Sequence, residues 1–122
     1  MAEPAKGIVE QHGGWDPLYK AVKPAELPWN AGGPDSDLAR LVQDSRLPQG
    51  RALDAGTGPG HDAAHLALNG WQVLAVDLSS TALALAAKTI REAYAEGRVT
   101  LREADILSLR EPAESFALVH DR

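Results

Sequence analysis

Alternating glycines follow a carboxylate in residues 51–60, and their spacing carries the clearest chemical meaning in the sequence. A short apolar run ends at Asp54, and Gly56, Gly58 and Gly60 then fall at every second position. Glycine lets the backbone turn sharply and lets a ligand come close to bare peptide groups. If a helix begins directly after the turn, its first N–H groups have no intrahelical partners and face that ligand. The spacing therefore predicts a ligand-binding turn between a strand and a helix.

A second acid follows the next apolar run. Residues 71–77 are nearly all apolar and end at Asp77. Such runs are typical of parallel strands that are covered on both faces. A dinucleotide-binding turn would need its third glycine at position 61, which is occupied by His61. We therefore expect a strand–turn–helix–strand unit, and the glycine spacing disfavours NAD as its ligand.

The order Asp54-x-Gly56-x-Gly58-x-Gly60 resembles motif I of the class I S-adenosylmethionine-dependent methyltransferases. Asp77 stands where that family keeps the acid that holds the ribose hydroxyls. The resemblance implies S-adenosylmethionine as the cofactor and S-adenosylhomocysteine as its product. Because this cofactor has an ammonium and a sulfonium group but no pyrophosphate, an acid at the end of a strand suits it better than it suits a dinucleotide.

The resemblance also implies roles for residues around the turn. Asp62 either favours the dipole of the expected helix, by roughly 0.3–1 kcal/mol, or contacts the methionine end of the cofactor. Asp105 either hydrogen-bonds the adenine amino group, with Ala104 against the ring, or is an ordinary turn acid. The implied cofactor-binding positions are Asp54, Ala55, Gly56, Gly58, Gly60, His61, Asp62, Asp77, Leu78, Ala104, Asp105, Ile106, Trp29 and Trp15.

Two tryptophans stand in a polar, proline-broken lead. Residues 15–23 predict one or two helical turns, with Asp16 as the cap and Pro17 at the first helical position. Trp15 and Trp29 either cover the edge of the core or close over a bound cofactor or substrate. A tryptophan-containing lead with Pro-Trp ahead of motif I is similar to that of the thiopurine methyltransferase group. The relatives of this group are the thiocyanate/halide methyltransferases and the tellurite-resistance proteins. Asn30 stands where many of these have Asp.

The rest of the pattern alternates helices and strands. We expect helices at 35–47, 60–69 and 81–96, with Gly70 and Gly97 as the stops of the last two. The third should carry a packed stripe that includes Tyr94. We expect strands at 51–54, 71–77, 98–103 and 115–120, and a weakly helical connection at 107–113. A right-handed doubly wound path gives an α/β, Rossmann-like sheet in the order 3-2-1-4.

The fourth strand runs into an acid. S-F-A-L-V-H-D-R is similar to the F-D-x-x-x-D-R of the thiopurine methyltransferase group, with Ala117 in place of the usual acid. In class I enzymes, residues just past this strand line the methyl-transfer site. Asp121 is thus a candidate proton acceptor, or else a strand-end acid that pairs with Arg122.

The class I fold has seven strands in the order 3-2-1-4-5-7-6, and this chain ends after the fourth. Strand four would then be an uncharged apolar edge that invites pairing with another chain. Three explanations compete: the sequence is a fragment of a longer enzyme, two copies pair or exchange elements as a homodimer, or the lead folds back over the edge. We favour the first two.

Composition limits the function. The 122 residues suggest one domain, formed by a lead at 1–34 and a cofactor-binding half-domain at 35–122. The net charge is −5 without a basic block, so we expect no nucleic-acid partner. There is no cysteine, and we expect no metal, no membrane span and a cytoplasmic location. The leading hypothesis is methyl transfer to a small nucleophile: a thiol, a halide-like anion or a metalloid. The alternative is a cofactor-binding module without turnover.

Overall fold

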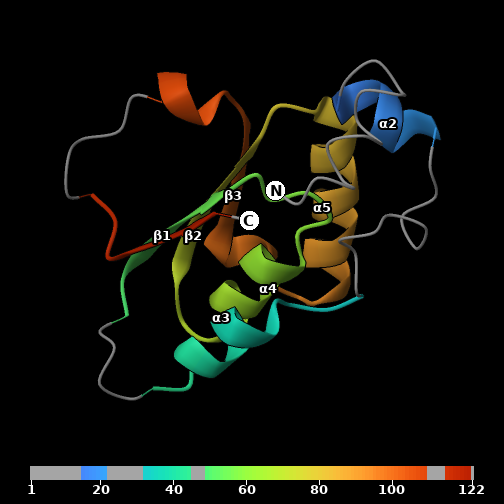
Figure 1. Ribbon diagram of the computed structural model, residues 1–122. Helices are drawn as coiled ribbons and strands as arrows, with labels where there is room; N and C mark the ends of the chain where they lie inside the picture. Colours follow the sequence, from blue (N-terminus) through green and yellow to red (C-terminus); the bar gives the residue numbers. More distant parts are fainter. Residues whose placement is uncertain (1–14, 22–31, 45–48, 110–114, 122) are drawn as a thin grey trace.

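Figure 1 shows a computed structural model of the chain, which describes residues 15–21, 32–44, 49–109 and 115–121. Its centre is a four-stranded sheet in the order β3-β2-β1-β4, with every pair parallel. This confirms the predicted α/β fold and strand order. The strands are β1 Arg51–Ala55, β2 Gln72–Asp77, β3 Val99–Glu103 and β4 Leu118–Asp121.

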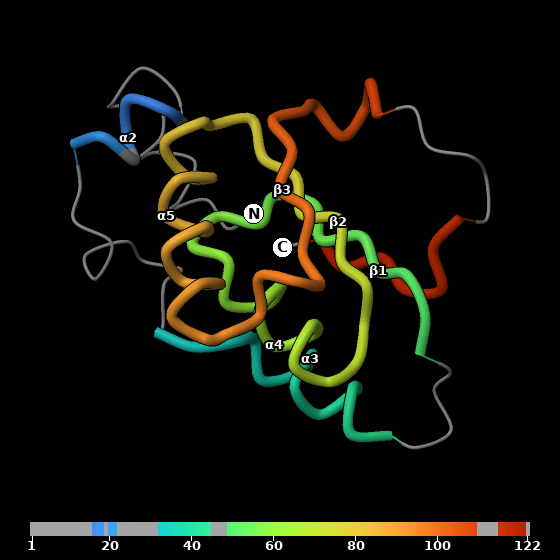
Figure 2. Tube along the Cα trace, turned by 180° about the vertical axis from the view of Figure 1, so that it is seen from behind, coloured from blue at the N-terminus to red at the C-terminus, as the bar shows by residue number. Residues whose placement is uncertain are grey.

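Three helices cover one face of the sheet, as Figures 1 and 2 show. They are α3 Ser36–Leu41, α4 His61–Leu68 and α5 Ser80–Glu92. Small and branched residues of these helices pack with Trp71, which is 1% exposed, and with alternate strand residues in one core. Leu53, Ala55, Leu74 and Val76 point to the other face and form a second cluster with Ala104, Leu109 and Phe116. The residues of β2 are therefore mostly buried on both faces, as its apolar run predicted, and so are those of β1, whereas β3 and β4 are only partly covered.

Several predicted boundaries were wrong by a few residues. Helix α3 ends at Leu41 and not at 47. Its N-cap is Asp35, whose carboxylate accepts from the N–H of Leu38 at 3.0 Å. β4 begins at Leu118 and not at 115, and β3 begins at Val99 because Glu96–Arg98 forms a short 3₁₀ helix. A second such turn, Ile106–Ser108, stands at the start of the expected weak helix.

The lead contributes helix α2, Trp15–Ala21, which packs on α5 (Figure 1). Asp16 lies inside its first turn, so the prediction that Asp16 caps this helix was wrong. Its carboxylate accepts hydrogen bonds from the start of α5 instead. In the described residues the outer edge of β4 pairs with no strand, and Val119 is 60% exposed there. Among those residues, no helix is long and apolar enough to cross a membrane.

Helices α4 and α5 end in the same way. After α4, the N–H of Trp71 bonds the carbonyl of Leu66 and the N–H of Gly70 bonds that of Ala67, with Gly70 at φ +94°. After α5, Ala95 bonds Ile90 and Tyr94 bonds Arg91, with Tyr94 at φ +58°. This Schellman pattern places one residue in the left-handed region. Gly97 is therefore not the stop of α5, and Tyr94 is 92% exposed and outside the packed stripe.

Replacing Tyr94 by glycine should stabilise the protein by about 0.5–1 kcal/mol. The left-handed conformation costs a residue with a Cβ roughly 1–2 kcal/mol, and the greater freedom of glycine in the unfolded chain cancels part of that gain. Urea unfolding measures the difference. Tyr94→Ala is the matched control, because it removes the exposed ring but keeps the Cβ. A glycine variant no more stable than the alanine variant would contradict the explanation.

Candidate functional site

The glycine turn has the conformation that its composition predicted. Gly56, Gly58 and Gly60 have φ values of +68°, +52° and +86°. The turn is tied to the neighbouring strand, since the N–H of Thr57 donates to the carbonyl of Val76 at 2.9 Å. Gly60 has a second reason to be glycine: a Cβ there would lie 2.9 Å from the Cα of Ala86 on α5. The turn is thus held between β2 and α5, at the carboxyl end of β1.

Asp77 lies directly beside this turn. Its Oδ2 accepts from the N–H of Gly58 at 2.9 Å, and its Oδ1 accepts from the N–H of Ser79 at 3.0 Å. Both oxygens are therefore oriented by backbone groups, one in the glycine turn and one in the segment that directly follows β2. Leu78, the next residue, is 56% exposed. The fold thus brings together the glycine turn and the second acid, as expected from the strand–turn–helix–strand pattern.

Three titratable side chains lie close together on β1, α4 and β4: Asp54, Asp62 and His120. Asp54 and Asp62 are only 1% and 4% exposed. The Nε2 of His120 lies 3.0 Å from the Oδ2 of Asp62, and the Oδ1 of Asp62 accepts from the N–H of Asp35 at 2.6 Å. The hydroxyl of Thr57 donates to Asp54 at 2.7 Å. Asp62 therefore links α4, the start of α3 and the end of β4.

Sequence reasoning missed His120. The signal that could have found it is the strand order, because β4 lies beside β1 and His120 is the register partner of Asp54. Side chains that are register partners on neighbouring strands point to the same face. An imidazole directly after the apolar run of β4 should therefore have been placed next to the motif I acid.

The cluster combines two acids with one basic side chain. The hydrogen bond to Asp62 raises the pKa of His120 above its ordinary value, and the charges of Asp54 and Asp35 add to this, while burial acts against it. With both carboxyls ionised and His120 protonated, the formal charges of Asp54, Asp62 and His120 sum to −1. One ligand atom from each of the three lies within 4.8 Å of the others. This donor set could hold a metal ion, and it also suits the ammonium group of an organic ligand.

The remaining predicted positions are spread along the same edge. The N–H of Ala104 donates to the carbonyl of Asp77 at 3.0 Å, which places the end of β3 beside β2. The carboxylate of Asp105 is exposed and accepts from the N–H of Leu107 at 2.9 Å, which is the geometry of a turn acid. Ile106 is 42% exposed. His61 is half-buried at the first position of α4.

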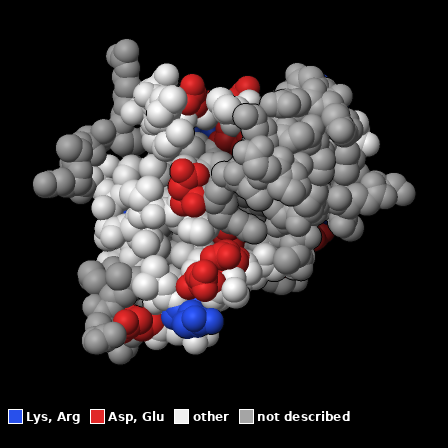
Figure 3. Space-filling model, viewed as in Figure 1, with Lys and Arg blue, Asp and Glu red and all other residues white. Residues whose placement is uncertain are grey.

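Asp121 takes no part in the contacts described above. Asp121 is exposed and is the register partner of Ala55, so it lies at the carboxyl edge next to the start of the glycine turn. Its suggested partner Arg122 lies outside the described residues, as do Trp29 and the side chain of Trp15. Figure 3 shows acidic side chains spread over the described surface on the face of Figure 1, with little basic surface between them.

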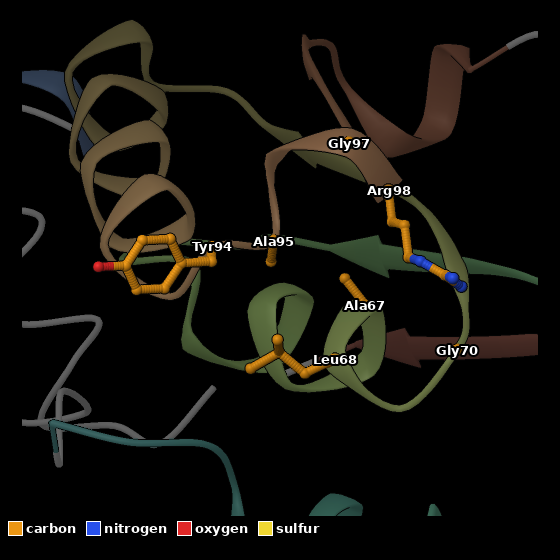
Figure 4. A pocket seen from close by; sticks show the side chains of 7 residues that line it. All are labelled: Ala67, Leu68, Gly70, Tyr94, Ala95, Gly97 and Arg98. Carbon is orange, nitrogen blue, oxygen red and sulfur yellow. The ribbon is translucent and has the colours of Figure 1, made fainter.

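A separate pocket of about 320 Å³ lies at the other end of the molecule (Figure 4). It is formed where α4 and α5 end, and Leu68, Gly70, Tyr94 and Arg98 are among its lining residues. These segments lead into the amino ends of β2 and β3, far along the strands from the glycine turn. The described residues that line it include no carboxylate or imidazole, so we place the candidate functional site at the carboxyl edge.

Known proteins share this sequence pattern. A family described as a methyltransferase domain matches residues 52–122. The probable thiol methyltransferase 2 of Arabidopsis thaliana is 33% identical, over 89% of this chain and 46% of its own length. Thiocyanate methyltransferase 1 of Brassica oleracea is 35% identical, over 98% of this chain and 52% of its own length. The chain thus spans about half the length of the curated relatives it matches.

Solved structures share the fold. One, from work on the conversion of a disulfide bond into a thioacetal group during echinomycin biosynthesis, has a TM-score of 0.71 and 37% identity, over 88% of this chain and 44% of that chain. Magnesium protoporphyrin IX methyltransferase of Synechocystis PCC 6803, with bound S-adenosylhomocysteine, has a TM-score of 0.55 and 34% identity, over 62% of this chain and 35% of that chain. The chain therefore belongs to the methyltransferase domain family, among the class I S-adenosylmethionine-dependent methyltransferases close to the thiol methyltransferase group.

Proposed function

We propose that this chain is an S-adenosylmethionine-dependent methyltransferase whose acceptor is a small soft nucleophile, a thiol or a thiocyanate-like anion. The observation that carries the proposal is the contact between the glycine turn and Asp77, at 2.9 Å. It puts a half-buried carboxylate beside the glycine turn, at the carboxyl edge of a parallel sheet, where ligands of such folds bind. The names of the curated relatives support the acceptor class.

Each group at this edge would have one task. Asp77 would accept the ribose hydroxyls, while Ala104, Asp105 and Ile106 would border the adenine. Asp62 and Asp54, the two buried acids near the turn, would favour the ammonium at the methionine end when they are ionised. In this assignment the Oδ1 of Asp105 keeps its bond to the N–H of Leu107, and its Oδ2 would accept from the adenine amino group.

The cofactor supplies an already activated methyl group on its sulfonium. The protein then has to hold the acceptor in line with that methyl, which supplies most of the rate. Asp121, exposed at the end of β4 beside the start of the turn, is the residue we propose to take the proton of a thiol acceptor.

The half-length of the chain favours a second candidate, a module that binds the cofactor but needs more protein for turnover. The edge of β4 is the observation behind it, since Val119 is 60% exposed and no described strand pairs there. A continuing chain or a second copy of this chain, as a homodimer, would cover that edge. Transfer of a tritiated methyl group to a panel of thiols and thiocyanate separates the two candidates. Binding without transfer by the 122-residue chain favours the module.

Binding itself is tested by thermal shift with S-adenosylhomocysteine. At a hundred times its dissociation constant the ligand should stabilise the protein by about 2.7 kcal/mol. Asp77→Ala should lose most of this gain, because the ribose hydroxyls lose their acceptor. Glu96→Ala, an exposed acid beyond the far end of α5, is the control and should keep it. An unchanged shift in Asp77→Ala would rule out the ribose assignment, and a larger shift with NAD would rule out the cofactor.

A further inference from the structure

The start of α5 is held by a carboxylate from a distant part of the chain. The Oδ1 of Asp16, on α2, accepts from the Ser79 hydroxyl at 2.7 Å and from the N–H of Thr81 at 3.0 Å. Ser79 is the N-cap of α5 and its hydroxyl oxygen also accepts from the N–H of Ala82. The first N–H groups of a helix need such partners and carry partial positive charge. Asp16 thus supplies from the lead what a capping residue normally supplies locally.

A continuous chain of hydrogen bonds leads from this contact to the glycine turn. Ser79, which is fully buried, donates its hydroxyl to Asp16 and its N–H to the Oδ1 of Asp77. The other oxygen of Asp77 accepts from Gly58. One side chain of α2 is therefore connected to the turn through Ser79 and Asp77, by hydrogen bonds of 2.7, 3.0 and 2.9 Å.

The Asp16 carboxylate stays charged in this arrangement. The N–H of Thr81, the hydroxyl of Ser79 and the ammonium of Lys20 hold the pKa of Asp16 well below its ordinary value. Lys20 lies 3.1 Å from the Oδ2 of Asp16 on the same helix, and its side chain is 67% exposed. The hydrogen bonds to α5 are therefore available throughout the neutral pH range, and Lys20 takes no part in the connection to Asp77.

We propose that Asp16 is a positioning residue of the cofactor site, which acts through Ser79 to orient Asp77, so that docking of α2 and binding of the cofactor strengthen each other. This inference rests on the proposed function, because it assigns Asp77 to the ribose. It gives the lead a role in the site that does not depend on its tryptophans: the Asp16 side chain positions Asp77. Coupling free energies are reciprocal, so the ligand should stabilise α2 as much as α2 stabilises the ligand.

The test is a double-mutant cycle on S-adenosylhomocysteine affinity, measured by calorimetry with the full 122-residue chain. Asp16→Ala should raise the Kd about tenfold. In an Asp77→Asn background the same change should alter the Kd by less than about twofold, because the residue through which Asp16 acts has already been altered. Asp37→Ala is the matched control, an exposed acid in the first turn of α3, and should leave the Kd unchanged.

Two further measurements separate positioning from a merely structural role. The preference for S-adenosylhomocysteine over its 2′-deoxyribose analogue should shrink in Asp16→Ala, since only the ribose contact depends on Asp77. Amide exchange in residues 15–21 should slow when wild-type protein binds the ligand, and should not in Ser79→Ala. If Asp16→Ala does not fold, Asp16→Asn, which keeps an acceptor oxygen, takes its place with the same expected direction and a smaller change.

The outcomes distinguish the two levels of the argument. A wild-type chain that does not bind S-adenosylhomocysteine overturns both the proposed function and this inference. Wild-type binding with an unchanged Kd in the Asp16 variants overturns the inference alone. The inference is also overturned if Asp16→Ala raises the Kd equally in wild type and in the Asp77→Asn background. Asp16 would then act by a route that does not pass through the Asp77 carboxylate.

Discussion

Replacing Gly60 by alanine should destabilise the protein by about 2–5 kcal/mol. A Cβ in the left-handed conformation, here φ +86°, costs roughly 1–2 kcal/mol. The added atom would also lie 2.9 Å from the Cα and Cβ of Ala86, and forcing an atom into a packed contact costs roughly 1–3 kcal/mol more. Because the clash is with backbone, no side chain can rotate away from it. Urea denaturation of the purified variant measures the loss.

Gly56→Ala is the matched control for this change. Gly56 has a similar φ of +68°, but a Cβ there would meet no atom within 4 Å. It should therefore cost only the roughly 1–2 kcal/mol of backbone strain. The difference between the two variants isolates the contact of the turn with α5. Equal losses in the two variants would show that α5 does not constrain the turn, contrary to the packing described above.

Asp62→Ala should cost about 3–5 kcal/mol of stability, the range for removal of one partner from a buried ion pair. Asp62 is 4% exposed, and its loss leaves the imidazolium of His120 without its hydrogen bond and the N–H of Asp35 without its acceptor. The low end of the range is expected, because His120 can lose its proton. Asp37→Ala, an exposed acid on α3, is the control and should stay within about 0.5 kcal/mol of wild type.

The pH dependence of stability tests the same pair. The pKa of His120 in the folded protein is raised above 6.5, mainly by the hydrogen bond to Asp62. A raised pKa means that the folded state holds the proton more tightly than the unfolded state does. The stabilisation is therefore fully present below pH 6.5 and is lost as the pH rises through the folded pKa. Unfolding of wild type and His120→Asn from about pH 5 to about pH 9 should converge at the alkaline end, and parallel curves would contradict the assignment.

Much of the candidate site at the carboxyl edge of the sheet can be predicted from local sequence pattern. The glycines at alternate positions after Asp54 and the acid that ends the next apolar run are read from neighbours in the chain, and the fold places them together. The strand order also follows, because right-handed crossovers leave few other paths for four parallel strands. Buried strands and capped helices have periods of a few residues, and these are visible in a single sequence.

Only the tertiary structure decided which partners Asp62 and Asp16 have. Asp62 meets His120 across 58 positions, and Asp16 meets Ser79 across 63. Each acid had a plausible local role in its own helix, as a dipole or cap residue, and nothing in the neighbouring sequence argues against that role. Tyr94 ends α5 in a conformation that usually belongs to glycine, because packing of the helix and of Ala95 outweighs the local preference. The sequence thus determined where the site is built, whereas the pairing of its charges depends on elements that meet only once the sheet has formed and the helices have packed against it.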